Sequence, residues 1–137
     1  MLDVNVIVSG FASPSGAPRI LIESWLLREF VLITSHHILQ GAERAWRNRY
    51  FRVRYEEREV ARALGLLRER ATFVMPGHSP RGVADDEEDD LVLATAVSGD
   101  ASVLVSGDIG LLKLVNFEGI PIVSPRECVE LITGMSS

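Results

Sequence analysis

The chain has 137 residues, of which 47% are hydrophobic, and its formal net charge is −5 at pH 7. This length suits one domain with a buried core, and no apolar run approaches the roughly 18 residues of a membrane span. The single cysteine, Cys128, excludes an internal disulfide and a cysteine-rich zinc site. We therefore expect a single domain over residues 1–137 of a cytoplasmic protein with no membrane partner.

The first half of the chain alternates between short apolar runs and helical patterns. Residues 1–8 are predicted to form a buried strand, followed by a loop rich in Gly, Pro and Ser. Pro18 can open the next helix at its first turn. A second strand is expected at residues 30–34, and Ser35 is a good N-cap for a helix running to about Asn48.

The second half continues this alternation. The pattern of apolar residues predicts helices at 54–70 and from the acidic run to about 98, a helical turn at 109–114, and a last helix capped by Ser124. Strands are predicted at 72–75, 102–106 and 120–123, and Pro121 favours a sheet edge for the last of them.

Strands that alternate with helices indicate an α/β domain. We expect a three-layer α/β/α sandwich with a central parallel sheet of four to five strands. In such folds, ligands bind beyond the carboxyl ends of the strands.

Acidic residues stand where this fold predicts a binding site. Asp3 lies in the first strand with Asn5 on the same face, and Asp108 follows the fourth strand after Gly107. Six acids in a row, residues 85–90, run directly into an apolar helix. Three distant acidic segments can therefore meet at one edge of the sheet. Oxygen ligands without nearby Cys or His favour Mg²⁺ or Mn²⁺ over zinc.

Positive charge is concentrated elsewhere in the sequence. Nine of the thirteen arginines lie between Arg44 and Arg70, where there are four glutamates. A basic surface beside an acidic pocket suits a metal-dependent enzyme that acts on a polyanion. Solvated Arg/Glu-rich helices are an equally good interpretation of the same pattern.

Four segments resemble the PIN domain family, the fold of VapC-type toxin ribonucleases. Residues 2–9 (LDVNVIVS) resemble the family's opening L-D-T-N-V-L-V-S, and residues 86–96 (DEEDDLVLATA) resemble D-P-D-D-D-P-V-L-A-L-A. Residues 104–108 (LVSGD) followed by Leu111 and Leu112 resemble L-V-T-G-D-x-D-L-L, and residues 122–127 (IVSPRE) resemble I-V-T-P-R-E. The resemblance covers essentially the whole chain.

This resemblance implies a function and a set of site residues. It implies an endoribonuclease that uses Mg²⁺ or Mn²⁺, acts as the toxin of a toxin–antitoxin pair, forms a homodimer and is inhibited by a small antitoxin. The metal-binding and catalytic acids are expected to be Asp3, Asp89 and Asp108. Supporting roles are expected for Asn5, Ser106 and Asp86. The concentration of arginines between residues 44 and 70, and not the resemblance, predicts that RNA phosphates bind there, with Arg44 and Arg47 among the expected residues. Glu87, Glu88 and Asp90 are expected to form the solvated first turn of their helix.

One family acid is absent. The family pattern S-P-E-L-L-E-E-L-R-E-V-L, matched from Ser35, places its glutamate on Gly41. Glu43 is a substitute only after a shift of the helix, because positions 41 and 43 lie on opposite flanks of the apolar face. The simpler interpretation pairs Glu43 with Arg47, four residues later. The family also has a few more residues before its first aspartate, which leaves open a start upstream or a truncated strand.

Three alternatives therefore remain. The first is a catalytically weakened PIN domain that binds RNA or an antitoxin because Gly41 replaces an acid. The second, a phosphoacceptor signalling domain, needs an aspartate after a middle strand, which neither candidate strand supplies. The third is a structural module whose acids are solvated caps. Two further expectations concern single side chains: His36 and His37 should lie on an exposed first turn, and Trp25 and Trp46 in the core or at a dimer contact.

Overall fold

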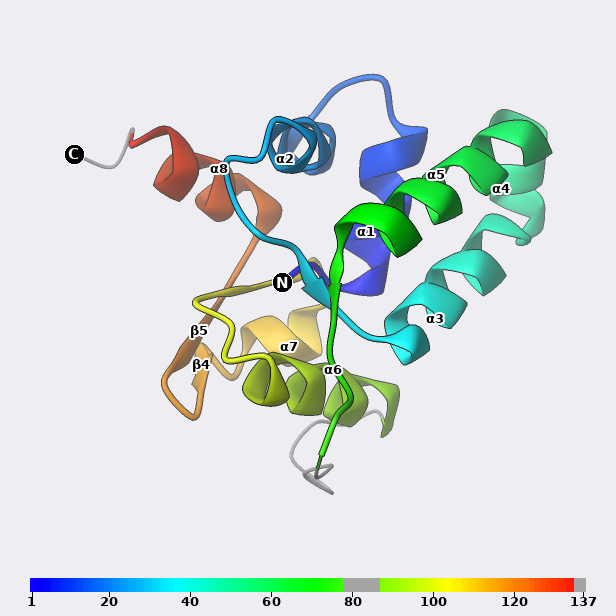
Figure 1. Ribbon diagram of the computed structural model, residues 1–137. Helices are drawn as coiled ribbons and strands as arrows, with labels where there is room; N and C mark the ends of the chain where they lie inside the picture. Colours follow the sequence, from blue (N-terminus) through cyan, green and yellow to red (C-terminus); the bar gives the residue numbers. More distant parts are fainter. Residues whose placement is uncertain (78–86, 135–137) are drawn as a thin grey trace.

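The structure is a computed structural model that describes residues 1–77 and 87–134. Its helices are α1 (Val4–Ala12), α2 (Ala17–Leu26), α3 (His36–Trp46), α4 (Arg49–Arg54), α5 (Glu57–Arg70), α6 (Glu87–Ser98), α7 (Ile109–Leu112) and α8 (Pro125–Thr133). Its strands are β1 (Ile33–Thr34), β2 (Thr72–Phe73), β3 (Leu104–Val105), β4 (Asn116–Phe117) and β5 (Ile120–Val123). Helices thus dominate the part of the chain that the structure describes (Figure 1).

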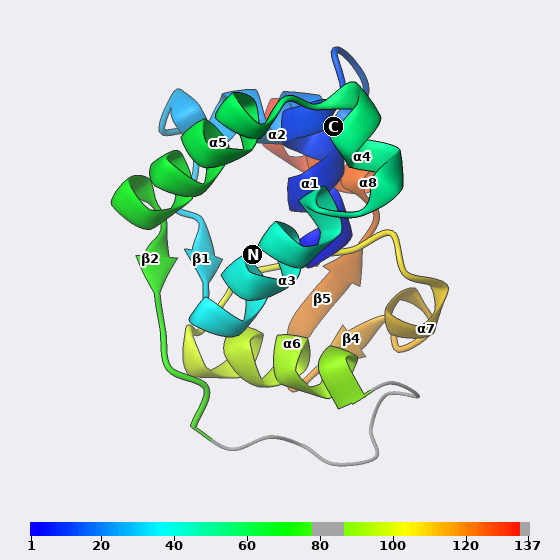
Figure 2. The same ribbon diagram turned by 90° about the vertical axis from the view of Figure 1, so that its right-hand side faces the viewer.

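Two small sheets lie between the helices. Strands β1 and β2 pair in parallel, and the other sheet has the order β3-β5-β4, with β3 parallel and β4 antiparallel to β5. In Figure 2, α5 lies above β1 and β2, α3 lies between β1 and β5, and α6 lies below β1 and β2. The chain is therefore α/β, but the predicted central parallel sheet of four to five strands is not what the described residues form. Their strands are two to four residues long and belong to separate ladders.

The predicted first strand is wrong for most of its length. Only Leu2 bridges to Val105, and Asp3 then caps a helix that begins at Val4. A continuous apolar run carries no clear period, so a buried helix and a buried strand look alike in sequence. The Asp3 side chain decides between them locally, because it accepts a hydrogen bond from the Val4 backbone N–H at 2.8 Å. Asp3 therefore stands at the end of the β segment and not within it.

The position predicted for the last strand is also wrong. β5 lies between β3 and β4, although Pro121 favoured an edge. Pro121 pairs with Asn116 of the short β4, whereas the parallel ladder to β3 registers only Ile122 and Val123. The ladder to β3 therefore begins just after the residue that lacks an N–H.

Helix boundaries follow local capping chemistry and agree better with the sequence. Ser35 caps α3 by accepting from the Ile38 N–H at 3.4 Å, and Ser124 forms a capping box with Glu127 at the start of α8. Pro18 lies in the first turn of α2, as predicted. The helix predicted over residues 54–70 instead begins at Glu57, and the short α4 precedes it.

The two tryptophans belong to the core, as predicted. Trp25 and Trp46 are 4% and 1% exposed, and Phe11 makes an edge contact with each ring. Helix α1 packs against both α2 and α3 and so joins these two parts of the core. Cys128 is buried in α8. None of the described helices combines the length and the apolar character that a membrane crossing requires.

Candidate functional site

Three acids from distant segments line one hollow, which we name the acid pocket. It has a volume of about 350 Å³ and is lined by Asp3, Asp89 and Asp108 together with groups of α1, α3 and α6. Asp3 precedes α1, Asp89 lies in the first turn of α6, and Asp108 precedes α7. The pairing of Leu2 with Val105 brings Asp3 and Asp108 to the same part of the molecule.

Asp3 is a buried carboxylate with fixed partners. It is 5% exposed; its Oδ1 accepts from the Val4 N–H at 2.8 Å and its Oδ2 accepts from the Ser106 hydroxyl at 2.7 Å. Burial raises the pKa of Asp3, and the nearby Asp108 carboxylate adds to this rise, while the bonds from Ser106 and Val4 oppose it. The folded protein thus holds a desolvated carboxylate whose charge is costly without a cation.

Ser106 connects two of the acids. Its side chain is fully buried, donates to Asp3 and accepts from the Asp108 backbone N–H at 3.0 Å. The Asp108 carboxylate accepts in turn from the Leu111 N–H at 3.2 Å and so caps α7. Asp3 and Asp108 are therefore both helix caps, and one serine sets their relative position.

Neighbouring acids of the acidic run lie on different faces of α6 and so have different surroundings. Asp89 is half-buried and lines the acid pocket, whereas Glu88 is exposed and pairs with Arg44 at 3.4 Å. The expectation that Asp90 is solvated is wrong, because Asp90 is 4% exposed. Asp90 shares a helix face with Leu93 and Ala94, three and four residues later, and both are fully buried or nearly so. Asp86 lies outside the described residues.

Gly41 lines the acid pocket at the position where the resemblance places a glutamate. A Cβ atom placed on Gly41 would lie 3.0 Å from Cγ2 of Val4, so a side chain there would enter the pocket with a small shift of Val4. Glu43 does not reach the acid pocket in the described structure. Its carboxylate pairs with Arg47 at 2.6 Å on another face of α3. Helix α3 therefore supplies no carboxylate to the acid pocket at position 41 or 43.

Other predicted residues lie in different relations to the pocket. Asn5 and Arg44 line it, while Arg47 lines a shallower hollow beside it. His37 was expected on an exposed turn, yet it is half-buried and lines both hollows. The signal for this position was available, because His37 is one helical turn before Gly41 and so shares its face. His36 is exposed and stacks on Phe73.

The donor chemistry of the acid pocket fits a hard divalent cation. Its acids offer oxygen ligands only, which Mg²⁺ and Mn²⁺ prefer, and Asp3 is a buried carboxylate that a cation would stabilise. Within residues 1–77 and 87–134, however, no three His, Cys, Asp or Glu side chains stand close enough together to hold a metal ion. The three acids thus line one pocket but would have to move closer together to bind one metal ion.

Comparison with known sequences gives one family. The profile described as PIN domain matches residues 1–110, which is most of the chain and includes Asp3, Asp89 and Asp108. Neither a curated protein nor a solved structure matches this chain.

Proposed function

We propose that this chain, which belongs to the PIN domain family, is a metal-dependent endoribonuclease and the toxin of a toxin–antitoxin pair. The PIN domain is generally a nuclease fold, and its members commonly depend on divalent metals. The observation that carries the proposal is the common lining of one pocket by Asp3, Asp89 and Asp108. The same proposal includes Mg²⁺ or Mn²⁺ as cofactor, a homodimer, a small antitoxin and action in the cytoplasm.

In the proposed mechanism, Asp3, Asp89 and Asp108 would hold the metal after a movement that brings them together. A bound divalent ion supplies charge stabilisation at the phosphate and a more acidic water molecule. Ser106 fixes the rotamer of Asp3 through its 2.7 Å bond, so one ligand is oriented before the substrate arrives. Arg44, at the rim, exchanges its exposed partner Glu88 for an RNA phosphate at little cost.

The absent acid favours a second candidate function, a weakened nuclease that binds RNA or an antitoxin but cuts poorly. Gly41 faces the acid pocket and contributes no carboxylate there. With fewer anionic ligands, a metal is bound less tightly, and cleavage is slower at a given metal concentration. The two candidates share the same site and differ in rate.

Metal-dependent cleavage of a mixed RNA pool separates the possibilities. The nuclease proposal expects cleavage that needs Mg²⁺ or Mn²⁺ and that is lost in Asp108→Asn, a variant that keeps a good helix cap. The weakened candidate expects faster cleavage by Gly41→Glu than by the wild type. Gly65→Glu is the matched control, because it makes the same change on an exposed face of α5 with no atoms nearby.

Each outcome has a clear meaning. Cleavage by the wild type that Gly41→Glu does not improve excludes the weakened candidate. Cleavage by neither protein, with either metal, contradicts the nuclease proposal. If Gly41→Glu and Gly65→Glu increase the cleavage rate equally, the cause is a more stable helix, because helix propensity favours other residues over glycine by up to about 1 kcal/mol. That result would also exclude the weakened candidate.

A further inference from the structure

A second hollow lies beside the acid pocket along one side of α3, and we name it the shallow hollow. It has a volume of about 400 Å³ and is lined by His37, Gln40, Glu43, Arg44, Arg47 and Glu88. The acid pocket shares His37, Arg44 and Glu88 with it, so the two spaces adjoin. A long substrate held in the acid pocket would therefore extend over this part of α3.

The hydrogen-bond donors of the shallow hollow follow one stripe of α3. We name them the donor stripe: His37, Gln40, Arg44 and Arg47. Their spacing of three, four and three residues keeps them within an arc of about 80° and spreads them over about 15 Å of the helix axis. Each side chain of the donor stripe can offer at least one N–H group. A row of donors of this length suits a chain of phosphates better than one small anion.

The two donors without a permanent charge are available to a ligand. His37 is half-buried and Gln40 is exposed. Across residues 1–77 and 87–134, neither side chain has a hydrogen-bond partner. Such a donor can bind a phosphate oxygen without first breaking an internal bond. His37 lines both spaces, so it stands at the border between the donor stripe and the acid pocket.

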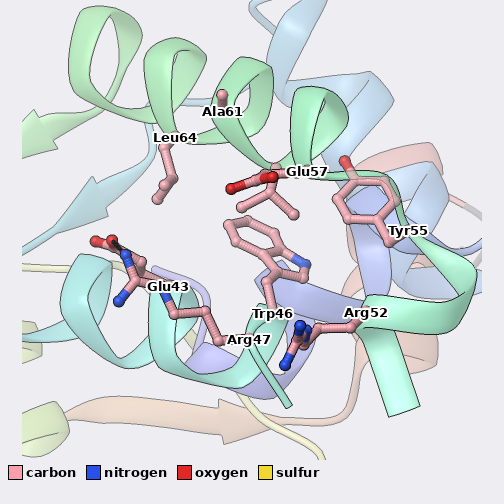
Figure 3. Close-up of a pocket in the computed structure, with 9 residues that line it drawn as sticks. Glu43, Trp46, Arg47, Arg52, Tyr55, Glu57, Ala61 and Leu64 are labelled. Atoms are coloured by element: carbon pink, nitrogen blue, oxygen red, sulfur yellow. Dashed lines mark hydrogen bonds and ion pairs between the residues drawn. The ribbon is translucent and has the colours of Figure 1, made fainter. Parts of the chain in front are cut away.

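The two charged donors have weak internal partners. Arg44 pairs with Glu88 at 3.4 Å, and Arg47 pairs with Glu43 at 2.6 Å. Figure 3 shows the Arg47 side chain extending back along α3 to the Glu43 carboxylate. The two arginine side chains remain 64% and 74% exposed, and exposed ion pairs of this kind are weak. A carboxylate and a phosphate bind the same face of a guanidinium, so Glu43 competes with any polyanion for Arg47.

We propose that the shallow hollow is a subsite for the RNA backbone, that the donor stripe binds successive phosphates and that Glu43 is an internal competitor which the RNA displaces. His37 is the positioning residue of this subsite, because the strand passes it on the way from the donor stripe to the acid pocket. Contacts to phosphates fix the register of a strand without reading its bases. The inference rests on the proposed function for the identity of the polyanion, and it adds the residues that place it.

Fluorescence anisotropy with a labelled single-stranded oligouridylate, in EDTA and at low salt, tests the competitor without cleavage. Glu43→Gln releases Arg47 and should tighten RNA binding by about threefold. Glu23→Gln is the matched control, because it removes the same charge from the same kind of pair, between residues four apart on one helix. Its partner Arg19 lines neither the acid pocket nor the shallow hollow, so this variant should gain less.

The adjacent histidines provide the second matched pair. His37→Ala should weaken binding of the oligouridylate by about tenfold, and His37→Gln, which keeps an N–H donor, should recover most of this loss. His36→Ala should have the smaller effect, because His36 is exposed and lines neither hollow. Arg47→Ala should lower the slope of log K against log salt by about 0.7, the value for one phosphate of a single strand, and Arg19→Ala should leave the slope unchanged.

The outcomes separate this inference from the proposed function. The subsite is overturned if the wild type does not bind the oligouridylate, or if Glu43→Gln gains no more affinity than Glu23→Gln, even in a protein that cleaves RNA. Equal losses in His37→Ala and His36→Ala overturn the positioning role of His37. The expected differences in a protein that never cleaves RNA support the subsite while the nuclease proposal fails.

Discussion

Replacing Ser106 by alanine tests whether this serine positions the acid pocket. The variant loses the 2.7 Å bond to Asp3 and leaves a carboxylate oxygen of a 5% exposed side chain without that donor. An unsatisfied buried polar group costs about 1–3 kcal/mol. With an unfolding entropy of about 2.1 cal/mol/K per residue, a loss of about 2 kcal/mol in this 137-residue chain lowers Tm by about 7 °C.

The pH dependence of this loss identifies its cause. The Ser106 bond opposes the rise in the pKa of Asp3, so removing the bond raises that pKa further. A bond that stabilises the charged carboxylate contributes when Asp3 is ionised, and its contribution falls as the pH drops through the pKa of Asp3. Thermal melts of metal-free wild type and Ser106→Ala should therefore differ more at about pH 8 than at about pH 5.

Ser35→Ala is the control for this experiment. Ser35 is equally buried, but its hydroxyl bonds to the Thr95 hydroxyl and the Ile38 N–H, neither of which titrates. Its loss should cost a similar free energy at both pH values. A destabilisation by Ser106→Ala below about 0.5 kcal/mol, or one that is as independent of pH as that of Ser35→Ala, would refute the positioning role.

Three other predictions concern stability and reactivity. The pKa of Asp3 is raised in the folded protein, so the stability that Asp3 contributes is full below its unfolded pKa and is lost as the pH rises through its folded pKa. Metal-free Asp3→Asn should therefore have a higher Tm than the wild type at about pH 8, and it should lose any rise in Tm that Mn²⁺ induces. A lower Tm for the variant at that pH would contradict this prediction. Val115 is 69% exposed and has a φ of 63°, a conformation that asparagine adopts more easily than valine, so Val115→Asn should raise the free energy of unfolding in urea by about 1 kcal/mol. Val31 is equally exposed and has no positive φ, so Val31→Asn should not raise it. Equal effects of the two substitutions would show that backbone strain at Val115 is not the cause. Burial raises the pKa of the Cys128 thiol, so a disulfide reagent should react with the native protein at least about a hundredfold more slowly than with the urea-unfolded chain, whereas equal rates would show an accessible thiol.

The parts of this fold that follow from neighbouring residues could be predicted, and the parts that follow from long-range pairing could not. Ser35 and Ser124 cap the helices they were expected to cap, because an N-cap depends on a side chain and the next three residues. Residues 1–8 were assigned to the wrong element, because an apolar run suits either a strand or a helix. The length of each strand depends on partners far away in the chain, such as Val105 for Leu2.

The same distinction applies to the site. The sequence predicted that three distant acidic segments meet, and in the structure Asp3, Asp89 and Asp108 line one pocket. The burial of Asp90 was missed although its helix face, shared with Leu93, pointed to it. The position of His37 in the wall of the pocket was missed too, although His37 lies one helical turn before Gly41 and so shares its face of α3.

Asp3 and Asp108 both cap helices, and in the proposed site the same carboxylates would also bind the metal ion. A carboxylate has about four lone-pair positions, and the bonds from Val4 and Ser106 use two of those on Asp3. These bonds fix the orientation of the carboxylate, which lines the acid pocket. Asp108 makes one such bond, to Leu111. In the proposed metal site, capping would reduce the entropy lost on ordering Asp3 and Asp108, so Asp89 would be the acid that has to move most.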